Sequence, residues 1–212
     1  TDGYLCLAAD DTTVPAEFII ETKEDGISEA AALATNADKA IVVIGCNPVI
    51  NSKEEIDRTT LQLPPAQQKL VDSVLKVNPH TIVVLVTNYP YTIQEIQKNV
   101  PGILSVASGS QELGNGLAAV LSGKTSPAGR LNMTWYLSDE DLGDINDYDI
   151  IQGKRTYQYF DREVLYPFGY GLSYTTFDYG KMQLTKTGAD INITVPLTNI
   201  GTTASDEVVQ LY

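Results

Sequence analysis

Apolar residues form continuous runs at three places in the middle of the chain, and each run predicts a buried strand. The runs occupy residues 40–45, 81–86 and 102–106. A continuous run, rather than alternation of apolar and polar residues, is typical of a parallel strand that is covered on both faces. We therefore expect these segments to form a buried parallel sheet.

Around these runs, apolar residues recur at intervals of three and four, which is the period of a helix that buries one face. Helices are expected at residues 27–37, from Pro64 or Pro65 to 77, around 93–97, and from about 108 to 121. Proline suits the first helical turn, because it loses no needed hydrogen bond there. Strands that alternate with helices through short connections predict a doubly wound α/β domain.

The pattern becomes irregular after residue 126. Residues 131–135 are expected to form an edge strand, and residues 155–160 a short extended run rich in aromatic side chains. Between them, residues 139–149 are acidic and lack any period. We expect this part of the chain to be mostly loop.

Both ends of the chain have extended patterns. Residues 190–195 alternate between polar and apolar, residues 207–211 do so more loosely, and a turn is expected at 199–201. This predicts half of an antiparallel β-sandwich. Residues 1–24 contain two short extended runs, which we expect to be the tail of an upstream β element. Since the chain starts at Thr1 and stops at Tyr212, we expect it to be part of a longer protein.

Composition excludes several classes of partner. The 43% content of hydrophobic residues is too high for a disordered chain. The net charge of −13 argues against binding to nucleic acid or to an anionic membrane surface, which require a cationic face. No apolar run approaches the roughly 20 residues of a membrane span. Two cysteines and one histidine provide neither a disulfide scaffold nor a metal site, so we expect no metal.

Two glycine motifs are partly similar to nucleotide-binding sites. Gly123-Lys124-Thr125 lacks the glycine that a phosphate-binding loop needs at position 118, and it follows a predicted helix instead of opening one. Gly123 is better interpreted as the residue that ends that helix. Gly45 follows a strand but lacks the second and third glycines of a dinucleotide fingerprint. We therefore expect no nucleotide cofactor.

The loop between the strand at 40–45 and the helix at 65 is the best candidate for chemistry. It carries Glu54, Glu55, Asp57 and Arg58, and it leaves the carboxyl end of a strand, where ligands bind in α/β folds. Burial or nearby negative charge could raise the pKa of a carboxyl group there enough for general acid catalysis. From charge alone, a solvated surface loop is the alternative. A glycosidase also needs a second carboxylate, and nothing in this chain nominates one.

Several stretches resemble glycoside hydrolase family 3, the β-glucosidase and β-xylosidase family. Residues 54–64, Glu-Glu-Ile-Asp-Arg-Thr-Thr-Leu-Gln-Leu-Pro, are similar to its Glu-Gly-x-Asp-Arg…Leu-Pro loop. The other stretches are 109–114, similar to Gly-Gln-Glu-x-Gly; 126–131 and 134–136, similar to Pro-Ser-Gly-Arg-Leu…Thr-Trp-Tyr; 155–177, a very close match; and 199–201 with 206–212, similar to the family's fibronectin III-like domain. The resemblance covers the chain in order from about residue 26 to its end.

The resemblance implies a fold and its boundaries. Residues 25–168 are expected to form an α/β domain, the (α/β)6-sandwich with a mostly parallel sheet. Residues 169–212 are expected to be a linker and the start of an all-β fibronectin III-like sandwich. Residues 1–24 remain the tail of an upstream β element.

The resemblance also implies a function. It suggests the C-terminal part of a retaining, exo-acting β-glucosidase or β-xylosidase that needs no cofactor. Glu54 would be the general acid/base, with Glu55 as the alternative because it stands where the family has glycine, and Asp57 and Arg58 would orient the loop. The partners would be a β-linked glucoside or xyloside and an N-terminal TIM barrel that carries the Asp nucleophile. A non-catalytic carbohydrate-binding or adhesion module is the other function that we consider.

Overall fold

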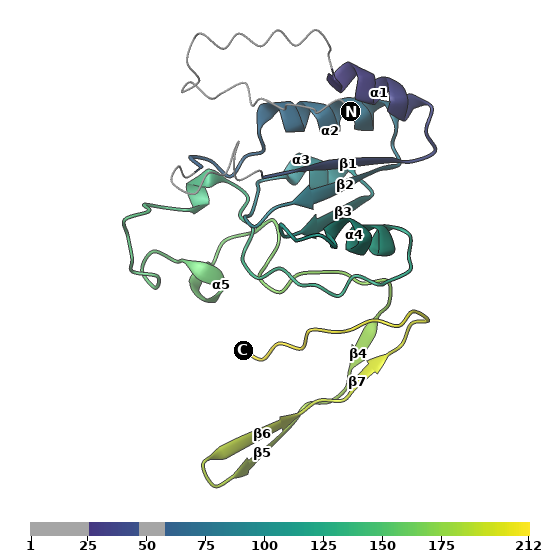
Figure 1. The fold of residues 1–212 in the computed structure, drawn as a ribbon. Helices are drawn as coiled ribbons and strands as arrows, with labels where there is room; N and C mark the ends of the chain where they lie inside the picture. The colour runs from purple at the N-terminus through teal and green to yellow at the C-terminus, as the bar shows by residue number, and fades with distance from the viewer. Residues whose placement is uncertain (1–25, 47–57) are drawn as a thin grey trace. The chain divides into compact units, whose positions relative to one another are not determined.

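A computed structural model of the chain describes residues 26–46 and 58–212. The chain divides into two compact units (Figure 1). The first unit runs to Gly109 and resumes over Thr134–Tyr166, and the second consists of Ser110–Met133 and Pro167–Tyr212. The extended runs expected within residues 1–24, and the residues Glu54, Glu55 and Asp57, lie outside the described residues.

The first unit is built on a parallel sheet of the three predicted strands. β1 (Ala40–Gly45), β2 (Thr81–Val86) and β3 (Gly102–Val106) lie in the order β1-β2-β3, as Figure 1 shows. Helices α1 (Gly26–Thr35), α2 (Pro65–Val77) and α3 (Gln94–Asn99) alternate with them along the chain. The prediction of an α/β domain with a parallel sheet is confirmed.

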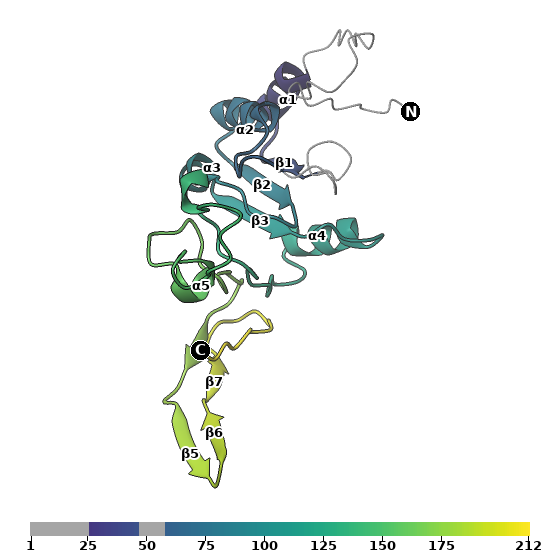
Figure 2. The same ribbon diagram turned by 90° about the vertical axis from the view of Figure 1, so that its left-hand side faces the viewer.

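The core of this unit lies between α2 and one face of the sheet. The register places Val42 beside Val83, and both side chains are buried. Val71 and Val74 of α2 are buried too, and α2 packs on β1 and β2. Figure 2 shows α1 beside α2. The buried Asn78 side chain donates hydrogen bonds to the carbonyl groups of Ala34 and Ala37, at 3.0 and 2.8 Å. This amide ties the end of α1 to the end of α2.

The burial of β1 differs from the expectation. Ile41 and Val43 are 52% and 59% exposed, although their neighbours Val42 and Ile44 are buried. β1 is the edge strand of the described sheet, and among the described residues only one of its faces is covered. β2, which lies between two strands, is buried on both faces as predicted.

The second unit contains one helix and two antiparallel strand pairs. Helix α4 (Leu113–Leu121) ends where Gly123 takes a φ of +76°, so Gly123 has the predicted helix-ending role. β4 (Phe177–Tyr179) pairs with β7 (Leu197–Asn199), and β5 (Gln183–Thr187) pairs with β6 (Asp190–Thr194). The two-residue loop of the β5–β6 hairpin begins at Gly188, whose φ of +67° fits a type II′ turn.

Three expected extended segments are wrong. Residues 131–135 form no strand, and Trp135 makes a single antiparallel bridge with Tyr166. Residues 155–160 contain the short helix α5 (Thr156–Tyr159), which begins at a positive φ of Thr156. Residues 207–211 pair with no described strand. Apolar and aromatic side chains in these three segments suit a strand locally, but tertiary contacts decide the backbone conformation of the segments.

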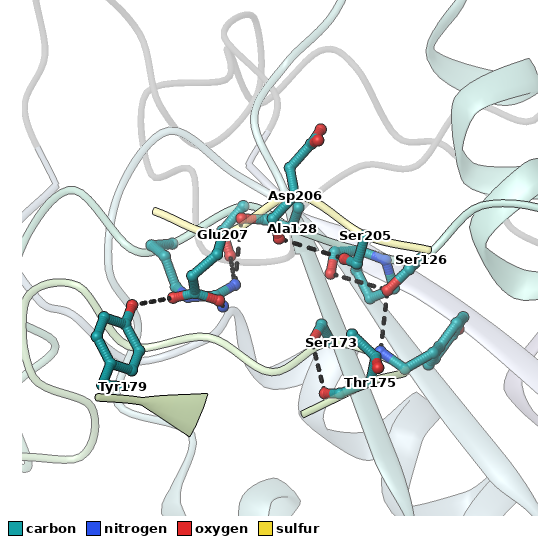
Figure 3. Close-up of polar contacts among 12 residues, drawn as sticks. Ser126, Ala128, Ser173, Thr175, Tyr179, Ser205, Asp206 and Glu207 are labelled. Atoms are coloured by element: carbon teal, nitrogen blue, oxygen red, sulfur yellow. Dashed lines mark hydrogen bonds and ion pairs between the residues drawn. The ribbon is translucent and has the colours of Figure 1, made fainter. Parts of the chain in front are cut away.

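The segment at 207 is held instead by a buried ion pair within the second unit. Arg130 Nη2 lies 2.7 Å from Glu207 Oε2, and the two side chains are only 10% and 11% exposed. Figure 3 shows the Tyr179 hydroxyl donating to the other Glu207 oxygen, at 3.1 Å. Arg130 and Tyr179 thus pair both oxygens of the carboxylate, so removal of either partner would leave a buried charge less well paired.

Candidate active-site scaffold

The carboxyl end of β1 is fixed by a close contact with β2 and by a side chain of α2. Gly45 has a φ of +142°, and a Cβ atom there would lie 1.9 Å from the carbonyl oxygen of Val86. Only glycine fits this position. The Gln67 side chain accepts a hydrogen bond from the Gly45 N–H at 3.0 Å and donates one to the Gly45 carbonyl at 2.8 Å. The point where the candidate loop leaves the sheet is therefore rigid.

The chain turns sharply after β2 and brings two tyrosines to the same edge of the sheet. The Thr87 hydroxyl donates to the Tyr89 carbonyl at 2.7 Å and accepts from the Tyr89 N–H at 3.0 Å. This local turn orients the Tyr89-Pro90-Tyr91 segment. Tyr89 is 47% exposed, whereas Tyr91 is only 1% exposed.

Arg58 holds the far end of the candidate loop against this segment. Its guanidinium carbon lies 4.6 Å from the ring centroid of Tyr91 and 5.2 Å from that of Tyr89. Its Nη2 atom donates to the Pro90 carbonyl at 3.3 Å. Cation–π attraction to two rings and a hydrogen bond between them fix the side chain. Its Nη1 atom is buried and has no hydrogen-bond partner in the part of the chain that the structure describes.

Burial changes the ionisation of Tyr91. It raises the pKa of the phenol above its ordinary value, and the positive charge of Arg58 opposes that rise without cancelling it. The hydroxyl is buried and, like Arg58 Nη1, has no hydrogen-bond partner among residues 26–46 and 58–212. Tyr91 is therefore a neutral ring that packs against a cation at neutral pH.

The residues that follow Arg58 are clamped from two sides. We call residues 58–63 the anchor segment. The Asp139 carboxylate accepts hydrogen bonds from the Thr60 hydroxyl and from the Leu61 N–H, both at 2.5 Å. On the other side, the Leu61 carbonyl accepts from the Thr92 N–H at 2.9 Å. The anchor segment thus joins the β2–α3 connection to the turn around residue 139.

Of the four predicted site residues, Arg58 alone lies in the described part of the chain. It occupies the carboxyl edge of the parallel sheet, where the sequence placed the loop. Sequence reasoning missed its partners Tyr89 and Tyr91, and it treated Asp139 as part of an irregular acidic stretch. A pair of tyrosines directly after a predicted strand was the available signal. The sequence around Asp139 contains no such signal, since the partners of Asp139 lie 78 and 79 residues away in the sequence.

The structure gives no support to a metal site or a membrane span in its described residues, and it assigns a local role to Glu112. Among residues 26–46 and 58–212, no group of three or more His, Cys, Asp and Glu side chains could hold a metal ion. No helix within these ranges is long and apolar enough to cross a membrane. Glu112 precedes α4, and its carboxylate accepts a hydrogen bond from Asn115 at 2.6 Å. This places Glu112 in a local helix-start contact.

Comparison with known proteins gives one family. Residues 7–174 match the glycosyl hydrolase family 3 C-terminal domain. A β-xylosidase of Formosa agariphila is 36% identical over 199 residues, which cover 89% of this chain and 27% of that protein. A β-glucosidase of Kluyveromyces marxianus is 35% identical over 201 residues, which cover 89% of this chain and 24% of that protein.

Solved structures agree with the sequence matches. The crystal structure of β-glucosidase from Kluyveromyces marxianus in complex with glucose superposes with a TM-score of 0.77 and 32% identity. The match covers 87% of this chain and 24% of that chain. The chain therefore spans about a quarter of the length of the curated relatives it matches.

Proposed function

Because the chain belongs to glycosyl hydrolase family 3, as that family's C-terminal domain, we propose that it supplies the general acid/base of a retaining, exo-acting β-glycosidase. The substrates are β-linked glucosides or xylosides, from which the enzyme removes the non-reducing-end sugar. The nucleophile is an Asp on an N-terminal TIM barrel of the same protein or of a partner chain. Residues 25–168 form the α/β domain of this enzyme, and residues 169–212 begin its fibronectin III-like domain.

The observation that carries the proposal is the anchoring of Arg58 at the carboxyl edge of the sheet. In the matched loop pattern, the acid/base Glu precedes this arginine by four residues, which gives Glu54. Four residues of fully extended chain span at most about 14 Å. A Glu54 carboxylate within this reach of Arg58 can serve a site at the carboxyl edge of the sheet, where ligands bind in α/β folds, and this supports the proposal.

The chemistry needs two carboxyl groups and water, and no cofactor. In a retaining enzyme the two groups lie roughly 5–5.5 Å apart. The barrel Asp attacks the anomeric carbon while Glu54 donates a proton to the departing glycosidic oxygen. Glu54 then removes a proton from a water molecule, which hydrolyses the glycosyl-enzyme. Asp57 and Arg58 orient the loop that carries Glu54.

Glu55 is the competing candidate for the acid/base. It occupies the position at which the family pattern has glycine, so a shift of one residue would exchange the two roles. The matched spacing to Asp57 and Arg58 favours Glu54. Substitution of each residue separates the two assignments.

The test uses the protein assembled with its barrel, as one chain or by co-expression. We expect Glu54→Ala to lower kcat/KM on phenyl β-glycosides by about 10²- to 10⁴-fold, the usual contribution of a general acid. On a 2,4-dinitrophenyl β-glycoside, whose aglycone departs without acid help, sodium azide should restore part of the turnover and yield a β-glycosyl azide, because azide attacks the glycosyl-enzyme without general base help. Glu55→Ala is the matched control and should retain most of the activity.

Two outcomes would contradict the assignment. If only Glu55→Ala loses activity and responds to azide, the acid/base is Glu55. If the assembled wild-type protein hydrolyses no aryl β-glycoside but still binds glucose or xylose, the non-catalytic carbohydrate-binding function replaces the enzymatic one.

A further inference from the structure

The Asp139 carboxylate makes two short contacts with the anchor segment. Its Oδ2 atom accepts from the Thr60 hydroxyl and its Oδ1 atom from the Leu61 N–H, both at 2.5 Å. The Thr60 oxygen also accepts from the Gln62 N–H at 3.0 Å. One carboxylate thus organises three consecutive residues. Hydrogen bonds to a charged acceptor are stronger than those between neutral groups.

The turn that presents Asp139 is itself fixed without help from the anchor segment. Asp139 begins the 3₁₀ helix η1 (Asp139–Asp141), which Ser138 and Asp141 close with a capping box. Asp141 also forms an ion pair with Arg162 at 2.8 Å. The Leu137 carbonyl accepts a hydrogen bond from Gln94 of α3 at 3.0 Å. These contacts tie the turn to Arg162 and to α3, so its position does not depend on the anchor segment alone.

The opposite side of the anchor segment is fixed by the β2–α3 connection. Leu61 and Leu63 are buried, Gln62 forms a parallel bridge with Thr92, and the Leu61 carbonyl accepts from the Thr92 N–H. Thr92 and Asp139 thus hold the segment from opposite sides, next to Arg58.

We infer that Asp139 is a positioning residue for the general acid, acting through Thr60 and Leu61. This inference rests on the proposed function. A general acid must reach the leaving oxygen at hydrogen-bond distance, and a displacement of about 1 Å can reduce the rate about 10²-fold. Asp139 touches neither substrate nor reacting atoms in this role. It holds the chain on which the acid is carried.

The test compares two aryl glycosides on the barrel-assembled enzyme. The aglycone of a 2,4-dinitrophenyl glycoside departs without protonation, whereas the aglycone of a phenyl glycoside must be protonated by the general acid as it leaves. We expect Asp139→Ala to lower kcat/KM on the phenyl glycoside at least about tenfold more than on the dinitrophenyl glycoside. A loss of folded enzyme alone would lower both values equally, so their ratio separates positioning from a merely structural role.

Matched variants complete the experiment. Glu140→Ala removes a neighbouring, exposed carboxylate of the same turn and should leave the ratio unchanged. Asp139→Asn retains one oxygen acceptor and should change the ratio less than Asp139→Ala. If Asp139→Ala does not fold, Thr60→Val removes the hydroxyl at nearly constant shape and should change the ratio in the same direction.

The inference is overturned if the ratio stays constant in both Asp139→Ala and Thr60→Val, or if Glu140→Ala changes it as much. A wild-type enzyme that hydrolyses neither glycoside would instead remove the proposed function, and the inference with it. The wild-type rates therefore distinguish the two failures.

Discussion

Arg58 shows how a single side chain can connect a loop to the edge of a sheet. Its flat guanidinium group packs against two tyrosine rings and still donates to the carbonyl between them. A lysine could not make this set of contacts, because its ammonium group has no planar face. The contacts leave two buried polar atoms without partners in the described residues, Arg58 Nη1 and the Tyr91 hydroxyl.

Tyr91→Phe tests whether the Tyr91 hydroxyl contributes to stability or whether the ring alone does. Phenylalanine keeps the ring that Arg58 contacts and removes an unpaired hydroxyl, so the unfolding free energy at pH 7 should fall by no more than about 1 kcal/mol and can rise. The pKa of Tyr91 is raised in the folded state. Its stabilising contribution is therefore complete below pH 10, the ordinary phenol range, and is lost as the pH rises above it.

Urea unfolding between pH 8 and pH 11 measures this difference. The wild type should lose more stability above pH 10 than Tyr91→Phe. Tyr148→Phe is the control, since Tyr148 is 87% exposed, and it should behave like the wild type. A large loss of stability in Tyr91→Phe at pH 7 would show that the hydroxyl has a partner.

At the level of elements, β1 and β2 need a glycine where they meet. The predicted strand at 40–45 has the observed bounds, but sequence reasoning used Gly45 only to reject a dinucleotide site. The structure shows its role, because the Val86 carbonyl occupies the space of a Cβ atom. Helices and strands with a strong hydrophobic pattern were predicted well. Residues 155–160 and 207–211 do not have the predicted extended or strand conformation, because distant residues contact them.

Gly45→Ala should therefore destabilise the first unit. The new methyl group overlaps backbone atoms and the φ of +142° disfavours any side chain, so we expect a loss of at least about 2 kcal/mol in unfolding free energy. Gly102→Ala is a matched control at the start of β3, where no heavy atom lies within 4 Å of the added carbon. Denaturation followed by far-UV circular dichroism measures both. Equal effects of the two substitutions would contradict the close contact.

At the level of the whole molecule, strong negative charge coexists with an exposed apolar face. The net charge is −13. The register of the β5–β6 hairpin places Leu184 opposite Ile193, with Ile191 on the same face, and all three side chains are exposed. An isolated hairpin is marginally stable in water, so this face favours association with another apolar surface.

We expect the 212-residue chain to self-associate through this face, and more strongly at high salt. Salt screens the repulsion between negatively charged molecules, with a Debye length that falls from about 10 Å at 0.1 M to about 3 Å at 1 M. Sedimentation velocity should show larger species as salt increases, and Leu184→Thr with Ile193→Thr should reduce them. A monodisperse monomer at all salt concentrations would refute this prediction.

The sequence by itself determined the α/β class, the positions of the three parallel strands and the family, because periodicity and motif residues are local properties of the chain. It also singled out Arg58, which the structure places at the edge of the sheet. Only the tertiary structure decided which face of β1 is covered, how Tyr89 and Tyr91 surround Arg58, and that Asp139 holds Thr60 and Leu61. These contacts join residues that are far apart in sequence, and no local pattern encodes such a distance.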